Sequence, residues 1–292
     1  ACKASILSSN LSATFFLGSV SLLLYLVSTP IGHLQDITRR ALEVLGRVDL
    51  ILCEDTRRSS ILLQKYEIQK PLVSFHKFNE AKVQEKILSD LHEGKEIALI
   101  SDAGTPCIND PGLALVQACI AAKIPFTAIP GACSVIQALV LSGFDSSRFQ
   151  FVGFFPKKGG REMFKTLLYY PGTSIGFESP ERLIKTLAML DELDSERRVA
   201  VVREMTKTFE ECVRGKPSEL MEHFGKASVR GEIVMLIAKR EMPTEDLPLD
   251  ELMQLLQELH GLPLKEAIKL AAQLKNMPKS AVYKQAHENL CL

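Results

Sequence analysis

Between residues 22 and 142 the chain alternates short apolar runs with longer amphipathic segments. In the amphipathic segments the apolar residues recur every three or four positions, which is typical of helices with one buried face. The apolar runs that we predict as strands are 22–28, 49–55, 71–75, 96–101 and 125–129. Almost wholly apolar strands, each followed by a helix, indicate a mainly parallel sheet covered on both faces.

A second α/β block is predicted from about residue 149 to residue 241. Its apolar runs cluster toward its end, which favours a mixed or partly antiparallel sheet. Gly and Ser punctuate the junction 141–149, and the break at 241–250 is followed by helical patterns. We therefore predict two α/β domains, residues 22–142 and 143–241, and a small helical C-terminal tail, residues 242–292.

Residues 1–21 form a leader that is rich in Ser, Ala and bulky apolar residues and has one Lys and no acid. This composition is typical of a targeting signal, but no clean cleavage site separates the leader from the first predicted strand, so an extension of another kind stays open. The later apolar runs are too short to span a bilayer. We expect a soluble, cytoplasmic protein without a membrane partner.

The 35 basic and 35 acidic residues give a formal net charge of zero. A polynucleotide partner must therefore be bound by a local basic patch. The 7 cysteines have no CxxC spacing and the 6 histidines have no HExxH spacing, so we expect neither a disulfide framework nor a metal site. Cys53, Cys119 and Cys212 lie in apolar segments and are predicted to be small core residues.

The segment LISDAGTPCINDPG, residues 99–112, joins a predicted strand to a predicted helix. A tight crossing explains its glycines and prolines, with Asp110 as the helix cap and Pro111 in the first turn. The crossing does not require Asp102, Thr105 or Asn109. Because ligands bind beyond the carboxyl ends of strands in open parallel sheets, contact with a ligand is the alternative to turn chemistry alone.

Three more loops follow predicted strands of the first domain, and their sequences are VSTPIGHLQDIT, CEDTRRS and IPGACS. Each has an ordinary interpretation as a turn or a helix start, and Glu54 and Asp55 in CEDTRRS can simply cap a helix and pair with arginines. Four such loops at one sheet edge favour a site. Neither GxGxxG after the first strand nor GxxxxGK[ST] occurs, so the ligand is predicted to need no phosphate cradle.

Blocks along residues 24–241 resemble a known family. They are LYLVSTPIGHLQDIT, ILCEDTRRSSILL, SDAGTPCINDPG, AIPGACS, FVGFFPKKGGR, FESPERL, VREMTKTFEECVRG and VRGEIVMLI, in this order. The order and the motifs are similar to those of the small-subunit ribosomal RNA ribose-2′-O-methyltransferases, class III enzymes of the tetrapyrrole methylase type. The tail segment SAVYKQ also resembles the C-terminal end of that family.

The resemblance implies that S-adenosyl-L-methionine (SAM) binds in a cleft between the two α/β domains. It implies that the methyl acceptor is the ribose 2′-hydroxyl of a cytidine in the decoding region of small-subunit rRNA. The residues carried over to cofactor binding are Pro30, Gly32, Asp102, Gly104, Thr105, Pro130, Gly131 and Ser134. The chain departs from the family pattern at His33, Cys107, Asn109, Ala132, Cys133 and Glu181.

The resemblance also places CEDTRRS on the substrate side and EMTKTFE in the second domain. Transfer from a sulfonium donor needs alignment and removal of the hydroxyl proton. Our hypothesis gives Asp55 or Glu204 the role of general base, while Arg57 and Lys207 hold the RNA backbone or stabilise charge. An exposed turn lysine is the equally acceptable interpretation of Lys207.

Arg58, Lys157, Lys158 and Arg161 are the predicted RNA contacts, although basic runs are more often solvated faces. The partner is expected to be small-subunit rRNA or the assembled small subunit, and the family resemblance also implies a homodimer. Two alternatives stay open. One is an enzyme of the same fold that acts on a tetrapyrrole or a modified protein residue, and the other is a non-catalytic SAM- or RNA-binding protein.

Overall fold

A computed structural model describes residues 23–157, 160–239, 247–254, 256–257 and 263–288. The predicted leader, residues 1–21, and the predicted RNA contact Lys158 lie outside the described residues. The chain divides into two compact units, Ala1–Cys133 and Ser134–Leu292.

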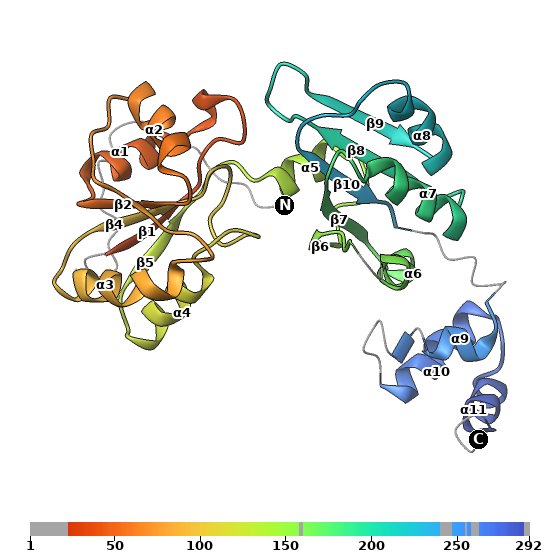
Figure 1. Cartoon of the computed structure of the whole chain (residues 1–292). Helices are drawn as coiled ribbons and strands as arrows, with labels where there is room; N and C mark the ends of the chain where they lie inside the picture. Colours follow the sequence, from red (N-terminus) through yellow and green to blue (C-terminus); the bar gives the residue numbers. More distant parts are fainter. Residues whose placement is uncertain (1–22, 158–159, 240–246, 255, 258–262, 289–292) are drawn as a thin grey trace, which may run out of the picture. The chain divides into compact units, whose positions relative to one another are not determined.

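The first unit contains a five-stranded sheet in the order β3-β2-β4-β1-β5 (Figure 1). All of its strand pairs are parallel, which confirms the predicted sheet type. Each strand is one to a few residues shorter than its predicted apolar run, because the ends of the runs lead into the loops. The strands are β1 (Leu24–Val27), β2 (Leu50–Cys53), β3 (Leu72–Ser74), β4 (Ile97–Ile100) and β5 (Phe126–Ile129).

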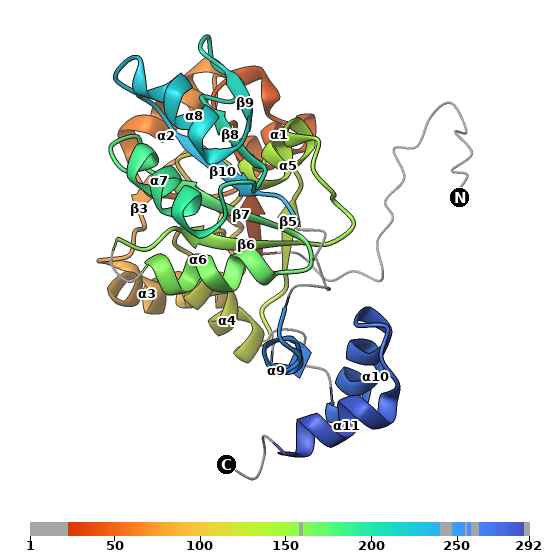
Figure 2. The same ribbon diagram turned by 90° about the vertical axis from the view of Figure 1, so that its right-hand side faces the viewer.

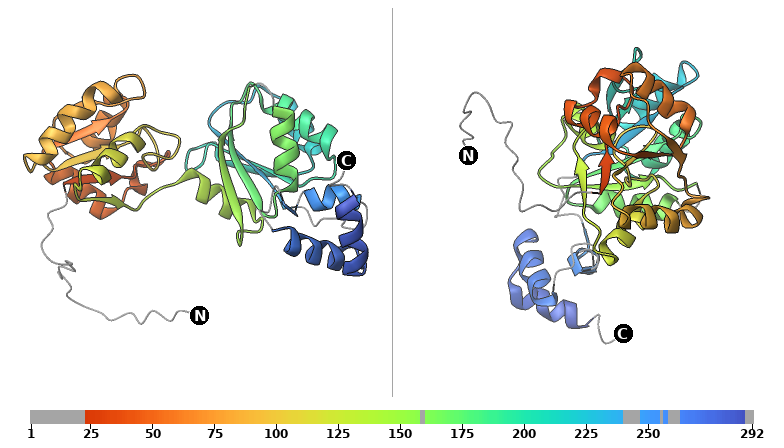
Figure 3. Two further views of the ribbon diagram at one scale, coloured as in Figure 1. Left: turned by 90° about the horizontal axis from the view of Figure 1, so that it is seen from below. Right: turned by 90° about the vertical axis from the view of Figure 1, so that its left-hand side faces the viewer.

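Helices cover both faces of this sheet (Figure 3). One face packs on α1 (Arg39–Arg47) and α2 (Thr56–Lys65), and its core includes Val27, Leu45 and Ile100. The other face packs on α3 (Glu80–His92) and α4 (Leu113–Ala121), and its core includes Leu24, Leu91 and Leu99. Successive residues of each strand therefore point to opposite cores, and this burial on both faces is the physical reason that the strands are apolar throughout.

Residues 34–48, one of the amphipathic segments between the predicted strands, have two parts. A short 3-10 turn, η1 (Leu34–Asp36), comes first, and α1 begins at Arg39. Thr38 separates them because its backbone is extended and its hydroxyl accepts the Ala41 N–H at 3.1 Å, which makes it the helix cap. Ile37 therefore lies outside the helix.

The second unit contains a five-stranded sheet in the order β6-β7-β10-β8-β9. Only β6 and β7 are parallel neighbours, and the other pairs are antiparallel, so the prediction of a mixed sheet is confirmed. Its strands are β6 (Phe149–Phe154), β7 (Thr173–Glu178), β8 (Val199–Arg203), β9 (Glu211–Gly215) and β10 (Ile233–Ile237).

Three helices cover one face of the second sheet, and their apolar sides form a common core with β8 and β10 (Figure 2). They are α6 (Gly160–Tyr169), α7 (Leu183–Leu193) and α8 (Pro217–Gly225). Helix α5 (Ser134–Ser142), which the sequence pattern grouped with the first domain, contacts β7, β8, β9 and β10. The first compact unit accordingly ends at Cys133.

The tail has a small core of its own. Helices α9 (Leu249–Gln254), α10 (Leu264–Leu274) and α11 (Lys279–Glu288) pack around Leu252, Ile268 and Val282. This agrees with the predicted helical tail. Within the part of the chain that the structure describes, no helix is long and apolar enough to cross a membrane.

The predicted core cysteines are partly confirmed. Cys53 and Cys119 are fully buried, whereas Cys212 is only half-buried, with its thiol 3.6 Å from the Leu141 carbonyl oxygen. Cys212 lies on β9, which is an edge strand, and this position explains its partial exposure.

Candidate functional site

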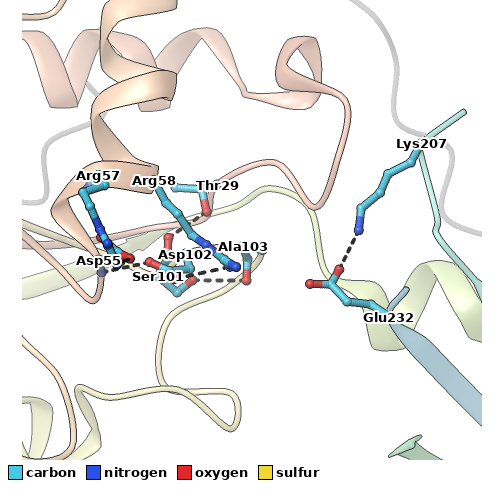
Figure 4. A network of polar contacts seen from close by, with 9 residues as sticks. All are labelled: Thr29, Asp55, Arg57, Arg58, Ser101, Asp102, Ala103, Lys207 and Glu232. Atoms are coloured by element: carbon cyan, nitrogen blue, oxygen red, sulfur yellow. Dashed lines mark hydrogen bonds and ion pairs between the residues drawn. The ribbon is translucent and has the colours of Figure 1, made fainter. Parts of the chain in front are cut away.

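Backbone contacts join the loops after β1 and β4 at the carboxyl edge of the first sheet. Thr29 and Gly104 form an isolated antiparallel bridge, in which the Thr29 N–H donates to Gly104 O at 2.9 Å and the Gly104 N–H donates to Thr29 O at 3.0 Å. The Thr29 hydroxyl donates to the Ser101 carbonyl at 3.1 Å (Figure 4). Gly104 has φ +83°, a conformation that glycine adopts at little cost.

A chain of hydroxyl contacts joins the loop after β5 to the same group. The hydroxyls of Ser28 and Thr105 lie 3.1 Å apart, and the Thr105 hydroxyl also donates to Ala132 O at 3.1 Å. Gly131 approaches Ser28 so closely that a Cβ at this glycine would lie 2.7 Å from the Ser28 Cβ. Three loops are thus held in one fixed arrangement. Of the remaining predicted cofactor residues, Pro30 is buried directly after Thr29, Gly32 and Pro130 are exposed, and Ser134 begins α5 in the second unit.

Asp102 links the loop after β4 to the loop after β2. Its carboxylate accepts the Asp55 N–H at 3.0 Å and lies 3.5 Å from the Arg58 guanidinium (Figure 4). The structure therefore brings Asp102, Gly104, Thr105 and Gly131 together with Asp55, Arg57 and Arg58 at one sheet edge, as expected for loops that follow parallel strands.

Asp55 is the N-cap of α2. Its carboxylate accepts the Arg57 N–H at 2.9 Å and is bound by the Arg57 guanidinium at 2.7 and 3.0 Å. The hydrogen bonds from the Arg57 side chain and backbone lower the pKa of Asp55 to about 2. A carboxylate with so low a pKa is a weak proton acceptor at neutral pH, so the structure favours the helix-capping interpretation of Asp55 over the general-base hypothesis.

Asp110 is not the helix cap that the sequence predicted. Helix α4 begins at Leu113, and Gly112, with φ +121°, occupies the N-cap position. Asp110 is instead half-buried, and burial together with the charges of Glu54 and Asp102 raises its pKa to about 6, against the Ser101 hydrogen bond and Lys77, which lower it. The loop continues past Pro111 because Gly112 adopts a conformation that side-chain-bearing residues avoid.

The raised pKa of Asp110 gives a testable pH dependence. The folded state binds the Asp110 proton more tightly than the unfolded chain does, so the contribution of Asp110 to stability falls as pH rises from about 4 to about 6 and stays unfavourable above that. Asp110→Asn should therefore stabilise the protein at pH 8 by about 1 kcal/mol, after allowance for solvent screening. Thermal unfolding at pH 4 and pH 8 tests this, since the advantage of the variant must disappear at the lower pH.

Two departures from the family pattern lie in the same loop. Cys107 and Asn109 have φ +69° and +67°, in the left-handed region where glycine is favoured. The backbone at Cys107 thus has a conformation that suits glycine better than cysteine. Burial, aided by the charges of Glu80 and Asp110, raises the pKa of the Cys107 thiol to about 11, so the thiol is protonated at neutral pH.

In the second unit Lys207 lies between two carboxylates. Its ammonium donates to Glu204 Oε1 at 2.8 Å and to Glu232 Oε2 at 3.0 Å, and Figure 4 shows the second contact. Burial lowers the pKa of Lys207, but the contacts with Glu204 and Glu232 raise it overall. The Lys207 contact lowers the pKa of Glu204 despite its burial. Lys207 is thus a held, protonated cation and not a free turn lysine.

The loop that carries Lys207 has strained backbone. Glu204 and Thr206 have φ +52° and +62°, and a β-branched residue in this region is a genuine outlier. Side chains hold the loop, because the Glu204 carboxylate accepts the Glu232 N–H at 3.1 Å and the Glu210 carboxylate accepts the Thr206 N–H at 2.5 Å. Strain of this kind persists where the surroundings enforce it and is concentrated at functional sites.

The predicted RNA contacts are spread over the two units. Arg58 and Lys157 are exposed, and Arg161 is exposed but pairs with Glu192 at 2.7 Å. Arg182 holds the first residues of the loop after β6. Its guanidinium donates to Phe155 O at 3.0 Å and also contacts the buried carboxylate of Glu178. The FESPER motif, to which the sequence assigned no role, therefore holds the beginning of the loop that contains Lys157.

Four residues of these networks were missed from the sequence. Ser28, Thr29 and Ser101 lie at strand ends, and the Ser101 hydroxyl donates to Gly104 O at 3.1 Å. Glu232 lies in the block VRGEIVMLI, whose glycine-acid pair was the available signal. Among the residues that the structure describes, no group of three or more His, Cys, Asp or Glu side chains is arranged to hold a metal ion.

Residues 23–221 match the model of the Tetrapyrrole (Corrin/Porphyrin) Methylases. The chain is 47% identical over 219 residues to Ribosomal RNA small subunit methyltransferase I of Thermotoga maritima, a match that covers 75% of this chain and 99% of that protein. It is 44% identical over 271 residues to the protein of the same name from Escherichia coli O157:H7, covering 91% and 94% of the two chains.

Solved structures share the fold at low sequence identity. Diphthine synthase aligns with a TM-score of 0.62 at 14% identity, over 88% of this chain and 100% of that one. Uroporphyrin-III C-methyltransferase of Thermus thermophilus, complexed with S-adenosyl homocysteine, aligns with a TM-score of 0.53 at 19% identity, over 74% and 97% of the two chains.

Proposed function

This chain belongs to the tetrapyrrole methylase family and, within it, to the small-subunit ribosomal RNA methyltransferases, and from this we propose that it methylates the ribose 2′-hydroxyl of a cytidine in the decoding region. The observation that carries the proposal is the 44% identity with the Escherichia coli relative over nearly the whole of both chains. It includes the loops at the carboxyl edge of the first sheet.

The first unit suits SAM as cofactor. Its sheet edge is lined by backbone groups, hydroxyls and carboxylates, and the closeness of Gly131 to Ser28 leaves no space for a Cβ. It lacks a glycine-rich phosphate cradle, which a phosphate-free cofactor does not require. Asp102 and Asp110 add negative charge that favours a cationic ligand. We assign Asp102, Gly104, Thr105 and Gly131 to cofactor binding.

SAM supplies an activated methyl group, so the protein has to align the acceptor hydroxyl, and the hydroxyl proton passes to solvent water as the oxygen is methylated. We assign Lys207 to the stabilisation of negative charge that develops on the ribose oxygen. An ammonium has three N–H donors; Glu204 and Glu232 accept two of them, and the substrate oxygen takes the third. Glu204 acts through Lys207 and is a positioning residue.

Neither carboxylate of the initial hypothesis is tuned as a strong base. Arg57 lowers the pKa of Asp55, and Lys207 lowers that of Glu204. We therefore propose that Asp55 and Arg57 shape the start of α2. Arg58, Lys157 and Arg161 remain the proposed phosphate contacts, and the proposed substrate implies a cytoplasmic location.

Mass spectrometry of rRNA tests the function directly. Small subunits and free small-subunit rRNA from a strain that lacks the enzyme are incubated with the protein and with isotope-labelled SAM. We expect one labelled ribose methyl, on a cytidine of the decoding region. A label on a base or on protein, or none in either substrate form, would contradict the proposal, and comparison of the two forms identifies the true substrate.

A further inference from the structure

The loop between β3 and α3 carries a fully exposed aromatic side chain. Phe78 is 97% exposed, whereas Phe75, three residues earlier, is 1% exposed and packs in the core. Exposing a phenyl ring to water has an unfavourable free energy compared with burying it. The neighbouring Lys77 is exposed as well, so the loop presents a ring and a cation together.

Hydrogen bonds hold this loop in one shape. Asn79 accepts the His76 N–H at 2.8 Å and donates its amide to the Ser74 carbonyl at 2.8 Å. The Phe78 N–H points to His76 Nδ1 at 3.2 Å, and the two rings meet edge to face with centroids 6.0 Å apart. Phe78 is therefore held outward by its own loop, which lowers the entropy lost when a ligand binds to the ring.

The same loop is tied to the proposed cofactor edge. Strand β3 is the neighbour of β2, and the Phe75 N–H donates to Cys53 O at 2.8 Å. The hydroxyl of Ser74 donates to the Glu54 carbonyl at 3.3 Å. On the other side, Glu80 accepts the Gly112 N–H at 3.2 Å, at the end of the loop that carries Asp102.

From this placement we infer that Phe78 is a stacking platform for an unpaired base of the RNA substrate and that Lys77 contacts the adjoining phosphate. The inference rests on the proposed function and names a part of its substrate-binding surface. Sequence-specific RNA recognition takes place on single-stranded segments, whose splayed bases stack on aromatic side chains. A 2′-hydroxyl becomes accessible for chemistry in such a segment.

The surroundings favour RNA over a protein partner. The residues next to Phe78 are Lys77 and Asn79. Helix α2, which follows the neighbouring strand β2, has Arg57 and Arg58 in its first turn, and their side chains are 89% and 66% exposed and pair with Asp55 and Asp102. A protein interface needs a contiguous surface of about 1,000 Å² with an apolar centre, and a single ring among cations does not supply one. A ring beside cations is the arrangement that binds single-stranded nucleic acid.

The expected effects differ between the two residues. Phe78→Ala should weaken binding of the RNA about tenfold, since stacking on one ring contributes about 1–3 kcal/mol. Phe78→Trp should restore binding, because it keeps an aromatic face. Lys77→Gln should reduce the slope of log K against log salt by about the amount that one phosphate contact contributes. Stacking on Phe78 should be retained.

Fluorescence of 2-aminopurine provides the readout, because stacking on an aromatic ring quenches the fluorescence of this base analogue at the position where the contact is made. The full-length protein is titrated into single-stranded oligoribonucleotides of the decoding-region sequence that carry 2-aminopurine at successive positions near the target cytidine. We expect quenching at one position with the wild type and Phe78→Trp, and none with Phe78→Ala. The matched control is Ile120→Ala, since Ile120 is 61% exposed at the far end of α4 and should bind like the wild type.

Several outcomes overturn the inference. Equal RNA affinity and equal quenching for Phe78→Ala and the wild type reject stacking, and a shift of Phe78→Ala in sedimentation without a change in RNA binding would assign the ring to contact between copies of the chain. Unchanged SAM affinity of all variants, measured by calorimetry, separates these results from misfolding. If the wild type fails to methylate small-subunit RNA, the proposed function fails. If Phe78→Ala methylates as fast as the wild type below saturating RNA, only this inference is overturned.

Discussion

Replacement of Lys207 by alanine is expected to lower the single-turnover rate of methyl transfer about a hundredfold or more while the affinity for SAM stays unchanged. The expected size is that of removing one preorganised donor from a developing oxyanion. Lys207 meets this description because Glu204 and Glu232 hold its ammonium at 2.8 and 3.0 Å and keep it protonated. Rapid-quench measurements at saturating SAM and RNA provide the rate.

A second variant displaces Glu204, which holds the Lys207 ammonium, without changing Lys207 itself. Gly231 has φ +94°, and a Cβ there would lie 2.4 Å from the Glu204 carboxylate. The flexible Glu204 side chain must then leave the Glu232 N–H, so Gly231→Ala should reproduce a large part of the rate loss. If Gly231→Ala retains the full rate, Glu204 has no positioning role.

The controls for Lys207 come from the same chain. Lys226→Ala removes a lysine that is 70% exposed and is paired with Glu222 on α8, and it should leave the rate unchanged. Asp55→Asn keeps a capping side chain and loses only the ionic part of the Arg57 contact, so its rate should stay within about tenfold of the wild type. A Lys207→Ala rate within threefold of the wild type would leave Lys207 with a structural role alone.

Gly131→Ala should weaken SAM binding at least tenfold with little change in secondary structure. The new Cβ would lie 2.7 Å from the Ser28 Cβ and 3.3 Å from the Ser28 carbonyl oxygen. Ser28 cannot move aside, because it is buried at the end of β1, between β4 and β5. The turn at Gly131 must move instead and breaks the contact of the Thr105 hydroxyl with Ala132 O. Calorimetric titration with SAM and with S-adenosyl homocysteine measures the loss.

Gly46→Ala is the matched control for this substitution. Gly46 lies in α1, and a Cβ added there meets nothing within 4 Å. Because alanine is a better helix former, this variant should be slightly more stable than the wild type and should bind SAM normally. If Gly131→Ala binds SAM as tightly as Gly46→Ala does, the loop after β5 is not part of the cofactor site.

Most of the fold followed from periodicity in the sequence. The apolar runs at 49–55 and 96–101 predicted strands buried on both faces, and both are central strands of a parallel sheet. Local capping was predicted less well. Thr38 interrupts a continuous helical pattern, and Gly112 takes the cap position that was assigned to Asp110, because each depends on backbone angles that the hydrophobic pattern does not encode.

The grouping of several candidate residues at one sheet edge was predicted, whereas their roles stay proposals. Asp102, Thr105 and Gly131 lie at one edge because each follows a strand of the parallel sheet. Ligands of open parallel sheets bind at that edge. The sequence left two roles open for Asp55, a general base or a helix cap paired with arginine, and the observed contact with Arg57 favours the second. Likewise, the pKa of Asp110 is raised first by burial and then by the charge of Glu54, which is distant in sequence, and neither can be read from the segment 99–112 alone.

The sequence by itself determined the α/β class, the change from a parallel to a mixed sheet and the family, because hydrophobic period and motif order are properties of the chain. Tertiary structure alone decided which side chains are held and in which protonation state. Lys207 is a fixed cation partly because Glu232, 25 residues further along the chain, accepts its ammonium, and the Asp55 N–H is bound by Asp102, 47 residues further along. Protonation and exposure depend on the local dielectric and on neighbouring charges, which exist only once the chain has folded.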